Sequence, residues 1–354
     1  MISMALFNNK GGVGKTTLVY HLAHMFQRMG HRVLAVDLDP QANLTAQFLD
    51  EDELASLWKE DEGLGSSAPR PAVLDPRRSR IRPGNGTLAT AIEPIMEGVG
   101  DVRLSEPVTV EDGLWLLPGD VNLASFEDRL SAAWPNSFLG RDVAALRTTT
   151  ALHRAIDHGA RETGADIVII DVGPNLGAIN RAALLSADTI LMPLAADLFS
   201  LRGLRNIGPT LRDWRVTWQG TILPRIPERI PAPRGLMMPI GYILVEPPAR
   251  ADRPSKGHGR WLDRIPGVFT TSVLGSAAAP ADGDRSFEIA TMKNYAALMP
   301  LAQDARKPMF ELRAGDGAVG GTQSAVRRCF SDFRELATKV RDRLVFIDPT
   351  LRRG

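Results

Sequence analysis

Residues 8–17 read NNKGGVGKTT, and this short stretch decides the fold. It follows an apolar run, ISMALF at 2–7, and precedes a segment at 16–29 whose apolar residues recur at helical spacing. A strand, a glycine-rich loop and a helix in that order form the context of a phosphate-binding loop. We therefore expect an α/β fold with a doubly wound, mostly parallel sheet flanked by helices.

The loop residues are suited to hold the phosphates of ATP. Glycine lets the backbone approach a ligand closely, and the N–H groups at a helix N-terminus attract anions. We expect Lys15 to reach the β- and γ-phosphates and the Thr16 hydroxyl to bind Mg²⁺. A glycine turn that binds nothing is the alternative, which the order of elements disfavours. The predicted nucleotide-binding residues of the loop are Asn9, Lys10, Gly11, Gly12, Val13, Gly14, Lys15, Thr16 and Thr17.

The loop departs from the usual spacing, G-x-x-x-x-G-K-[ST], at one position. Asn9 stands where the first glycine would be, and asparagine tolerates a left-handed backbone, so the turn can be kept. Lys10 precedes the glycines although phosphate binding does not require it. Composition alone would also allow a solvated surface lysine there.

The stretch KGGVGKTT, with Lys10 in front, resembles the deviant Walker A loop of the ParA/MinD family of P-loop ATPases. In that family the front lysine reaches across an ATP-sandwich dimer to the partner's phosphates. The resemblance covers roughly residues 1–49 and 150–345. It implies a homodimer whose catalytic residues are Lys10, Lys15 and Asp39.

Three aspartates end predicted strands. Asp37 and Asp39 stand one residue apart at the end of HRVLAVDLD, so both carboxylates can face the γ-phosphate region. By resemblance to switch I, Asp39 positions or activates the attacking water and Asp37 holds the metal through water. By resemblance to the Walker B strand and switch II, Asp171 lies on the Mg²⁺ side and Gly173 lies near the γ-phosphate. A single such aspartate is often only a helix cap, but three beside one phosphate loop are hard to explain that way.

The chain organisation suggests one P-loop domain, at 1–354, with additions. Residues 50–147 are too long for a connection between strands, so we expect an insertion of mixed helix, short strand and loop. A C-terminal amphipathic helix is expected at 323–345. Apolar patterns predict further strands at 114–120, 165–174, 189–197 and 238–247. They predict further helices at 126–134, 180–186 and 204–218.

Composition bounds the class of protein. The formal net charge is +1, and no apolar run approaches the roughly 18–20 residues of a membrane span. The N-terminus has no basic leader before an apolar stretch, so we expect a cytoplasmic protein. One cysteine, Cys329, excludes an iron–sulfur reductase of the same superfamily.

The resemblance implies a switch that moves plasmid, chromosome or other cargo. ATP dimers of the family bind DNA nonspecifically, and a ParB-like partner stimulates their slow hydrolysis. Basic residues that could contact phosphates fall in two groups, which are Arg202, Arg205, Arg212 and Arg215, and Arg327, Arg328, Arg334, Lys339, Arg341 and Arg343. A solvated helix face balanced by Asp332, Glu335 and Asp342 is the alternative. Binding to DNA would associate the protein with the nucleoid.

Three other functions remain open. A MinD-like membrane switch would need a C-terminal amphipathic helix, but the run at 344–347 is short and Pro349 follows it. A small-molecule enzyme on this fold would need acid–base groups of its own, and the six histidines form no recognisable constellation. A non-catalytic scaffold would bind nucleotide without turnover, against which Lys10 and Asp39 argue.

Overall fold

A computed structural model describes the chain except for residues 59–78, 247–258, 260, 279–280, 282, 296 and 354. Eight strands form one sheet in the order β3-β4-β2-β5-β1-β6-β7-β8. Neighbouring strands run parallel except β3 and β4, which are antiparallel. The strands are β1 (Ile2–Leu6), β2 (Val33–Asp37), β3 (Val108–Glu111), β4 (Leu114–Leu117), β5 (Ile167–Asp171), β6 (Thr189–Leu194), β7 (Met238–Val245) and β8 (Glu288–Met292).

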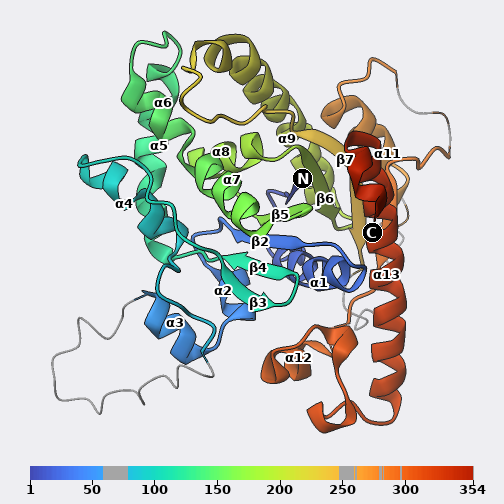
Figure 1. Cartoon of the computed structure of the whole chain (residues 1–354). Helices are drawn as coiled ribbons and strands as arrows, with labels where there is room; N and C mark the ends of the chain where they lie inside the picture. The colour runs from blue at the N-terminus through green and yellow to red at the C-terminus, as the bar shows by residue number, and fades with distance from the viewer. Residues whose placement is uncertain are drawn as a thin grey trace.

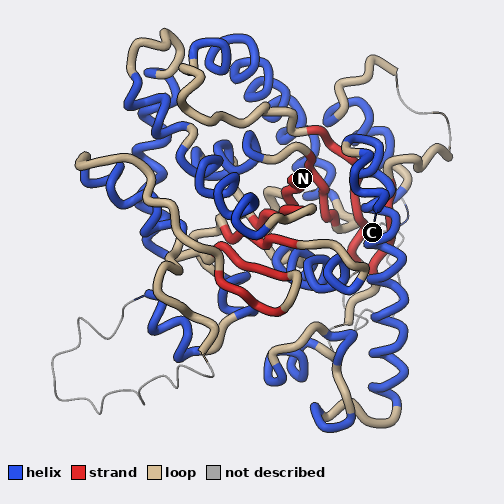
Figure 2. Tube along the Cα trace, in the orientation of Figure 1, coloured by secondary structure: helices blue, strands red, loops and turns tan. Residues whose placement is uncertain are grey.

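Helices cover both faces of the sheet (Figures 1 and 2). Met4 and Leu6 pack in the core on one face, whereas Ala5 and Phe7 pack in the core on the other. Burial of both faces is typical of a doubly wound parallel sheet. The first core contains α1 (Lys15–Arg28), α2 (Asn43–Phe48), α3 (Glu51–Trp58), α12 (Met299–Ala305) and α13 (Gly321–Ile347). The second contains α4 (Leu88–Glu97), α5 (Phe126–Asn136), α6 (Val143–Thr149), α7 (Ala151–Thr163), α8 (Ala178–Ser186), α9 (Leu198–Thr217) and α11 (Ile265–Val268).

The doubly wound, mostly parallel sheet confirms the fold class expected from the sequence. The predicted strands correspond to β1, β2, β4, β5, β6 and β7. The two edge strands, β3 and β8, were missed. Edge strands carry partly exposed polar residues, such as Glu111 and Glu288, and so lack the continuous apolar run of a central strand. Short helical turns lie at Val121–Ser125, Trp218–Ile222, Leu223–Arg225, Phe269–Val273, Met309–Glu311, Ala314–Asp316 and Pro349–Arg353.

The segment expected as an insertion, residues 50–147, contributes to the main sheet. Strand β4 pairs in parallel with β2, and β3 pairs with β4 at the edge. Helices α4, α5 and α6 of the same segment pack into the core on one face. Most of its Pro/Arg-rich stretch at 66–86 lies outside the described residues. The described part of this segment is thus continuous with the rest of the fold.

The predicted helices correspond to α1, α5, α8, α9 and α13, with small differences at their ends. Helix α9 begins at Leu198, earlier than the expected residue 204. Asp197 caps it, because its Oδ1 accepts a hydrogen bond of 2.8 Å from the backbone N–H of Ser200. The helix therefore starts beside the phosphate loop, next to Lys10.

His21 ties α1 to the C-terminal part of the chain. Its Nδ1 lies 2.7 Å from the carbonyl oxygen of Thr17, and its Nε2 lies 3.0 Å from the backbone nitrogen of Met309. The backbone N–H donates to Nε2, so the ring is neutral with its proton on Nδ1. Burial lowers the pKa of His21 to about 3.

This depressed pKa predicts an acid-sensitive contribution to stability. The unfolded chain binds a proton near pH 6.5, whereas folded His21 does not, so stability is present above pH 6.5 and is lost as the pH falls. Between pH 6.5 and 5 this group should lower the free energy of unfolding by at most about 2 kcal/mol. In urea unfolding, the free energy of unfolding of His21→Gln should therefore change less between pH 6.5 and pH 5 than that of the wild type. His158→Gln, at a partly exposed site on α7, is the control and should show the same change with pH as the wild type. A wild-type change with pH in His21→Gln would contradict the depressed pKa of His21.

Candidate functional site

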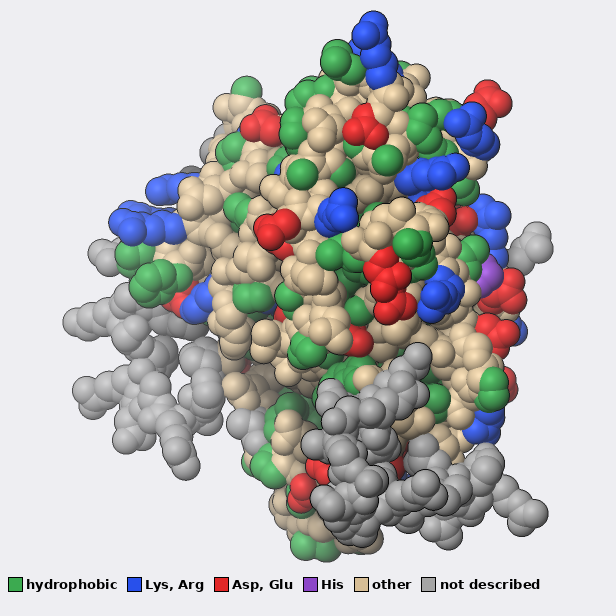
Figure 3. Space-filling view, turned by 90° about the vertical axis from the view of Figure 1, so that its left-hand side faces the viewer, with side chains coloured by type: hydrophobic (Ala, Val, Ile, Leu, Met, Phe, Trp, Pro, Cys, Tyr) green, Lys and Arg blue, Asp and Glu red, His purple; other side chains and the backbone are tan. Residues whose placement is uncertain are grey.

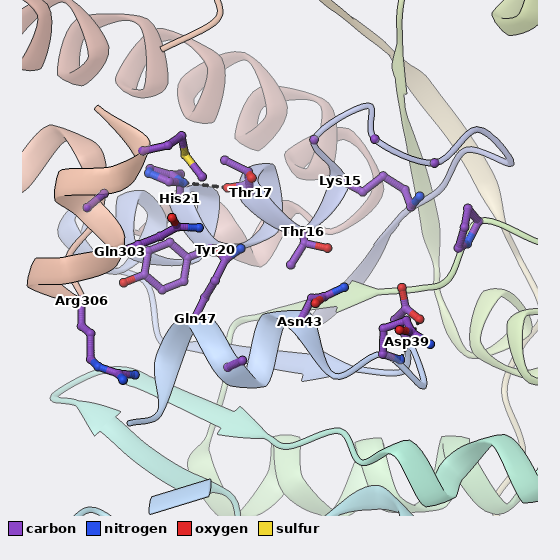
Figure 4. Close-up of a pocket in the computed structure, with 18 of the residues that line it drawn as sticks. Lys15, Thr16, Thr17, Tyr20, His21, Asp39, Asn43, Gln47, Gln303 and Arg306 are labelled. Atoms are coloured by element: carbon purple, nitrogen blue, oxygen red, sulfur yellow. Dashed lines mark hydrogen bonds between the residues drawn. The ribbon is translucent and has the colours of Figure 1, made fainter. Parts of the chain in front are cut away.

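The phosphate loop joins β1 to α1 and lines a cavity of about 690 Å³ (Figure 4). Gly12 and Gly14 have φ angles of 74° and 77°, a left-handed backbone that glycine adopts without strain. A Cβ at either position would meet nothing within 4 Å, so the loop is open. Gly14 caps α1 without any side-chain hydrogen bond. The first backbone N–H groups of α1 are therefore oriented to bind an anion.

Asn9 does not have the left-handed backbone expected of it. Among the described non-glycine residues, positive φ angles occur at Ala42, Met237 and Arg306. The Asn9 side chain instead packs against α9, where a Cβ on Gly203 would come within 2.6 Å of Asn9 Oδ1. The expected reason for Asn9 was therefore wrong, since the following glycines supply the left-handed geometry.

Lys15 and Thr16 open α1 and line the cavity (Figure 4). Lys15 is buried, and burial lowers its pKa, against which the charges of Asp171 and Asp39 act. These carboxylates keep a positive group where negative phosphates would lie. Of the loop residues predicted to bind nucleotide, Gly11, Gly12, Gly14, Lys15, Thr16 and Thr17 line the cavity, whereas Asn9, Lys10 and Val13 do not.

Asp171 is fully buried at the end of β5, directly opposite Asp37 in the register of β2 and β5. Neither carboxylate oxygen has a hydrogen-bond partner of good geometry among the described residues, although the Thr16 hydroxyl is near enough to favour the charged form. Burial first, and then the charge of Asp37, raise the pKa of Asp171. An unpartnered buried carboxylate calls for an explanation, and a bound cation supplies one.

The residues present fit Mg²⁺. Two carboxylates, Asp171 and Asp37, and the Thr16 hydroxyl offer the oxygen ligands that this ion prefers. Within the described part of the chain, no cluster of three or more His, Cys, Asp or Glu side chains could hold a metal unaided. Mg²⁺ usually keeps several waters and takes phosphate oxygens as further ligands, so a small protein ligand set is typical.

Asp37 is held by the helix that follows it. Its Oδ2 accepts hydrogen bonds from the backbone N–H and the hydroxyl of Thr45, at 2.8 and 2.7 Å. Burial raises the pKa of Asp37, and these two bonds act in the opposite direction. Its Oδ1 accepts a longer hydrogen bond of 3.3 Å from the backbone N–H of Asp39, so both oxygens already have donors, and contact with the metal through water stays a prediction.

Asp39 lines the cavity, two residues after Asp37 (Figure 4). Its Oδ1 accepts a hydrogen bond of 3.1 Å from the backbone N–H of Gln41. The same oxygen would lie 3.4 Å from a Cβ on Gly173, so the two predicted switch residues are neighbours. Sequence reasoning missed Asn180, whose Nδ2 donates to the Gly173 carbonyl at 2.8 Å and ties the loop to α8.

Lys10 lies outside the cavity that Gly11, Gly12 and Gly14 to Thr17 line. Its ammonium group forms an ion pair with Asp197 at the start of α9, and both side chains are about one-third exposed. It also lies 5.9 Å from the centre of the Phe199 ring. Lys10 therefore does not contribute to the phosphate site of its own chain in this arrangement.

The cavity extends from the phosphate loop, where the phosphates of ATP are expected, toward α12. Tyr20, Gln47, Gln303 and Arg306 line this part (Figure 4). No sequence motif pointed to these residues, since Tyr20 and Gln47 stand on α1 and α2 outside the phosphate loop and Gln303 and Arg306 belong to the region of α12, far from the loop in the chain.

The basic residues of α9 and α13 divide into engaged and exposed side chains. Lys339 pairs with Glu335 at 2.7 Å, and Arg341 pairs with Asp342 at 3.0 Å, as the solvated-face alternative expected. Arg212, Arg215 and Arg343 donate to backbone carbonyls. The basic side chains that are exposed, with no ion pair in the described part of the chain, are Arg202, Arg205, Arg327, Arg328 and Arg334.

The C-terminal apolar run is largely used in packing. Leu344 is buried, Val345 and Ile347 pack against the core, and Phe346 is 90% exposed. No helix in the described ranges is both long and apolar enough to span a membrane. A single exposed phenylalanine falls short of an amphipathic membrane face.

Comparison with known proteins bears on this site. A family model described as an AAA domain matches residues 1–221, including the segment 50–147. Chromosome-partitioning ATPase Soj of Thermus thermophilus is 30% identical over 212 residues, which are 60% of this chain and 62% of that protein. A probable plasmid-partitioning protein ParA of the same organism is 27% identical over 277 residues, 78% of this chain and 66% of that one. Each match thus spans less than two thirds of the relative's own length.

Solved structures share the fold. A protein from Corynebacterium diphtheriae has a TM-score of 0.62 and 24% identity, with 98% of this chain and 100% of that chain covered. A putative plasmid partition protein from Borrelia burgdorferi, solved with AMPPNP, has a TM-score of 0.55 and 16% identity, with 96% and 98% covered. At these identities the likeness concerns the fold alone.

Proposed function

The chain belongs to the ParA/MinD family of P-loop ATPases, and from this premise we propose that it is a ParA-like ATPase that dimerises on ATP and is reset by slow, partner-stimulated hydrolysis. One observation carries the proposal. The buried Asp171 carboxylate, which has no hydrogen-bond partner of good geometry among the described residues, and Asp39 both act on the charge of Lys15 in the phosphate loop, whereas Lys10 lies outside the cavity of its own chain. This arrangement supports a hydrolytic site that a second chain completes.

The residues take separate roles in the proposed reaction. The loop N–H groups and Lys15 bind the phosphates, and the backbone of Gly173 lies near the γ-phosphate. Asp39 orients the attacking water and accepts its proton. Thr16, Asp171 and, through water, Asp37 would hold Mg²⁺, which neutralises charge on the β- and γ-phosphates when bound.

The dimer proposal is supported by an exposed apolar pair beside the site. Leu198 and Phe199 are 41% and 71% exposed at the start of α9, next to Lys10. Burial of such side chains against a second chain would stabilise the dimer. The ion pair between Lys10 and Asp197 is partly exposed, and such pairs contribute at most about 1 kcal/mol. Its loss on dimerisation would therefore be a small cost.

We further propose that the ATP dimer binds duplex DNA nonspecifically, in the cytoplasm at the nucleoid, and that a ParB-like protein stimulates it. On the face that includes α4 and α5, basic side chains lie scattered among acidic ones (Figure 3). The unpaired arginines of α9 and α13 are better candidates for phosphate contacts. Family relatives named for chromosome and plasmid partitioning support this reading.

The rival functions have less support. A MinD-like membrane switch would need the C-terminal apolar residues that the core already uses. A small-molecule enzyme would need acid–base groups beside its own substrate, and both ring nitrogens of His21, the histidine that lines the cavity, are hydrogen-bonded. Phosphate released to water, with none transferred to a small molecule, would separate the ATPase from such an enzyme.

DNA binding can be tested with fluorescent duplex DNA at several salt concentrations, in ATP and in ADP. The double variant Arg202→Ala and Arg205→Ala should bind about tenfold more weakly at 0.1 M salt and should show a shallower salt dependence, by about 1 to 2 in log–log slope. Arg161→Ala, a 74% exposed arginine paired with Asp157, is the matched control and should bind like the wild type. Equal binding in ATP and ADP would contradict a DNA switch.

A further inference from the structure

The turn after β4 contacts the Asp37 carboxylate through one side chain. The backbone N–H of Gly119 donates to Thr45 Oγ1 at 2.8 Å, and the Thr45 hydroxyl donates to Asp37 Oδ2 at 2.7 Å. Thr45 and Asp37 are both fully buried. In a dry environment each of these groups depends on its partner, because no water can replace it.

Gly119 also fits tightly against Asp37 itself. A Cβ at Gly119 would come within 2.9 Å of Asp37 Cγ and 3.0 Å of its backbone oxygen. Its own carbonyl accepts a hydrogen bond of 3.3 Å from Trp58 Nε1 on α3. The turn is therefore fixed on one side by α3 and rests on Asp37 on the other.

The same segment of chain reaches the second switch region eight residues later. The Glu127 carboxylate on α5 accepts hydrogen bonds from the backbone N–H groups of Ala178, at 2.5 Å, and Ile179, at 3.0 Å. These are the first N–H groups of α8, where a negative charge is stabilising. Asn180, in the same turn of α8, holds the carbonyl of Gly173.

We propose that residues 118–127 form a common support for both switch regions, in which Gly119 and Thr45 position Asp37 and Glu127 positions α8 and, through it, Gly173. The proposal rests on the proposed function, since it concerns how the Mg²⁺–ATP site is held. Residues of a segment expected to be an insertion thus become positioning residues of the site.

The Thr45 hydroxyl gives the sharpest test. Thr45→Val keeps the shape but leaves the Gly119 N–H without an acceptor and Asp37 Oδ2 with one donor fewer. Thr45→Ser keeps both hydrogen bonds. Thr163→Val is the matched control, because Thr163 is also buried and its hydroxyl donates to the backbone of its own helix.

The measurement is the Mg²⁺ concentration needed for tight AMPPNP binding by the full chain, with binding in EDTA as reference. Thr45→Val should weaken the apparent Mg²⁺ affinity about tenfold, the size typical of groups that orient metal ligands. Thr45→Ser and Thr163→Val should stay within about twofold of wild type. Equal Mg²⁺ dependence in Thr45→Val and Thr163→Val would overturn the proposal. If Thr45→Val does not fold, Gly119→Ala perturbs the same contact and is read in the same way.

A double-mutant cycle tests whether the support is shared. Glu127→Gln, with the exposed Glu162→Gln as control, should also weaken the apparent Mg²⁺ affinity. Combined with Thr45→Val, the loss should be at least about threefold smaller than the product of the two single losses, as for coupled sites. Independent, multiplicative losses would overturn a common support. AMPPNP binding is measured without ATP turnover. If the protein neither hydrolyses ATP nor dimerises, the proposed function is contradicted, but the effect of Thr45 and Glu127 on Mg²⁺ affinity can still be measured.

Discussion

Asp39→Ala is expected to form an ATP-dependent dimer that hydrolyses ATP at least about 100-fold more slowly than the wild type, the usual size for loss of a positioned base. Asp39 lines the cavity beside Gly173, and in the described part of the chain its side chain accepts one hydrogen bond, from the backbone N–H of Gln41 in its own turn. Removing it takes away the carboxylate that, in the proposed reaction, orients the attacking water. The phosphate loop and Lys15 are untouched, so ATP should still bind.

Phosphate release and size-exclusion chromatography in ATP and ADP measure these two properties separately. Lys15→Ala is the contrasting variant, which should lose nucleotide binding and the dimer together. Asp128→Ala, an exposed aspartate on α5, should behave as wild type. Turnover by Asp39→Ala at the wild-type rate would remove Asp39 from the mechanism.

The parts of this site that could be predicted from the sequence are those set by local pattern. The phosphate loop consists of ten consecutive residues, so its motif is visible in the sequence. The strands that end at Asp37 and Asp171 are predicted by their apolar runs. Parallel register then brings those two carboxylates opposite each other. The strand order brings together segments that are distant in the chain, and the resemblance to switch I and the Walker B strand had already placed both carboxylates beside the phosphate loop.

The supporting residues could not be predicted because their partners are distant in the chain. Gly119 lies 74 positions from Thr45, and Glu127 lies 51 positions from Ala178. A glycine in a turn and a glutamate on a helix have ordinary local explanations. Their roles depend on where β4 joins the sheet, and a sequence pattern contains no information on that pairing.

Lys10 illustrates the same limit at the level of the assembly. The sequence predicts a lysine of unusual importance, and the single chain shows it paired with Asp197 away from the cavity. Both statements hold if Lys10 contacts the phosphates of the ATP that the other chain binds. Lys10→Ala should therefore bind ATP within about twofold of wild type, while turnover falls about 10³-fold, as for loss of a cation supplied in trans.

Mixing two inactive variants can decide whether Lys10 acts in trans. In a twofold dimer of Lys10→Ala with Asp39→Ala, one site combines the intact Asp39 of the first chain with the intact Lys10 of the second. An equal mixture should recover about a quarter of wild-type turnover, because half the dimers are mixed and each has one complete site of two. Asp197→Asn, which removes the ion pair within one chain, should leave this recovery in place. No recovery on mixing, with both variants still dimeric in ATP, would place Lys10 in the site of its own chain and exclude the shared active site.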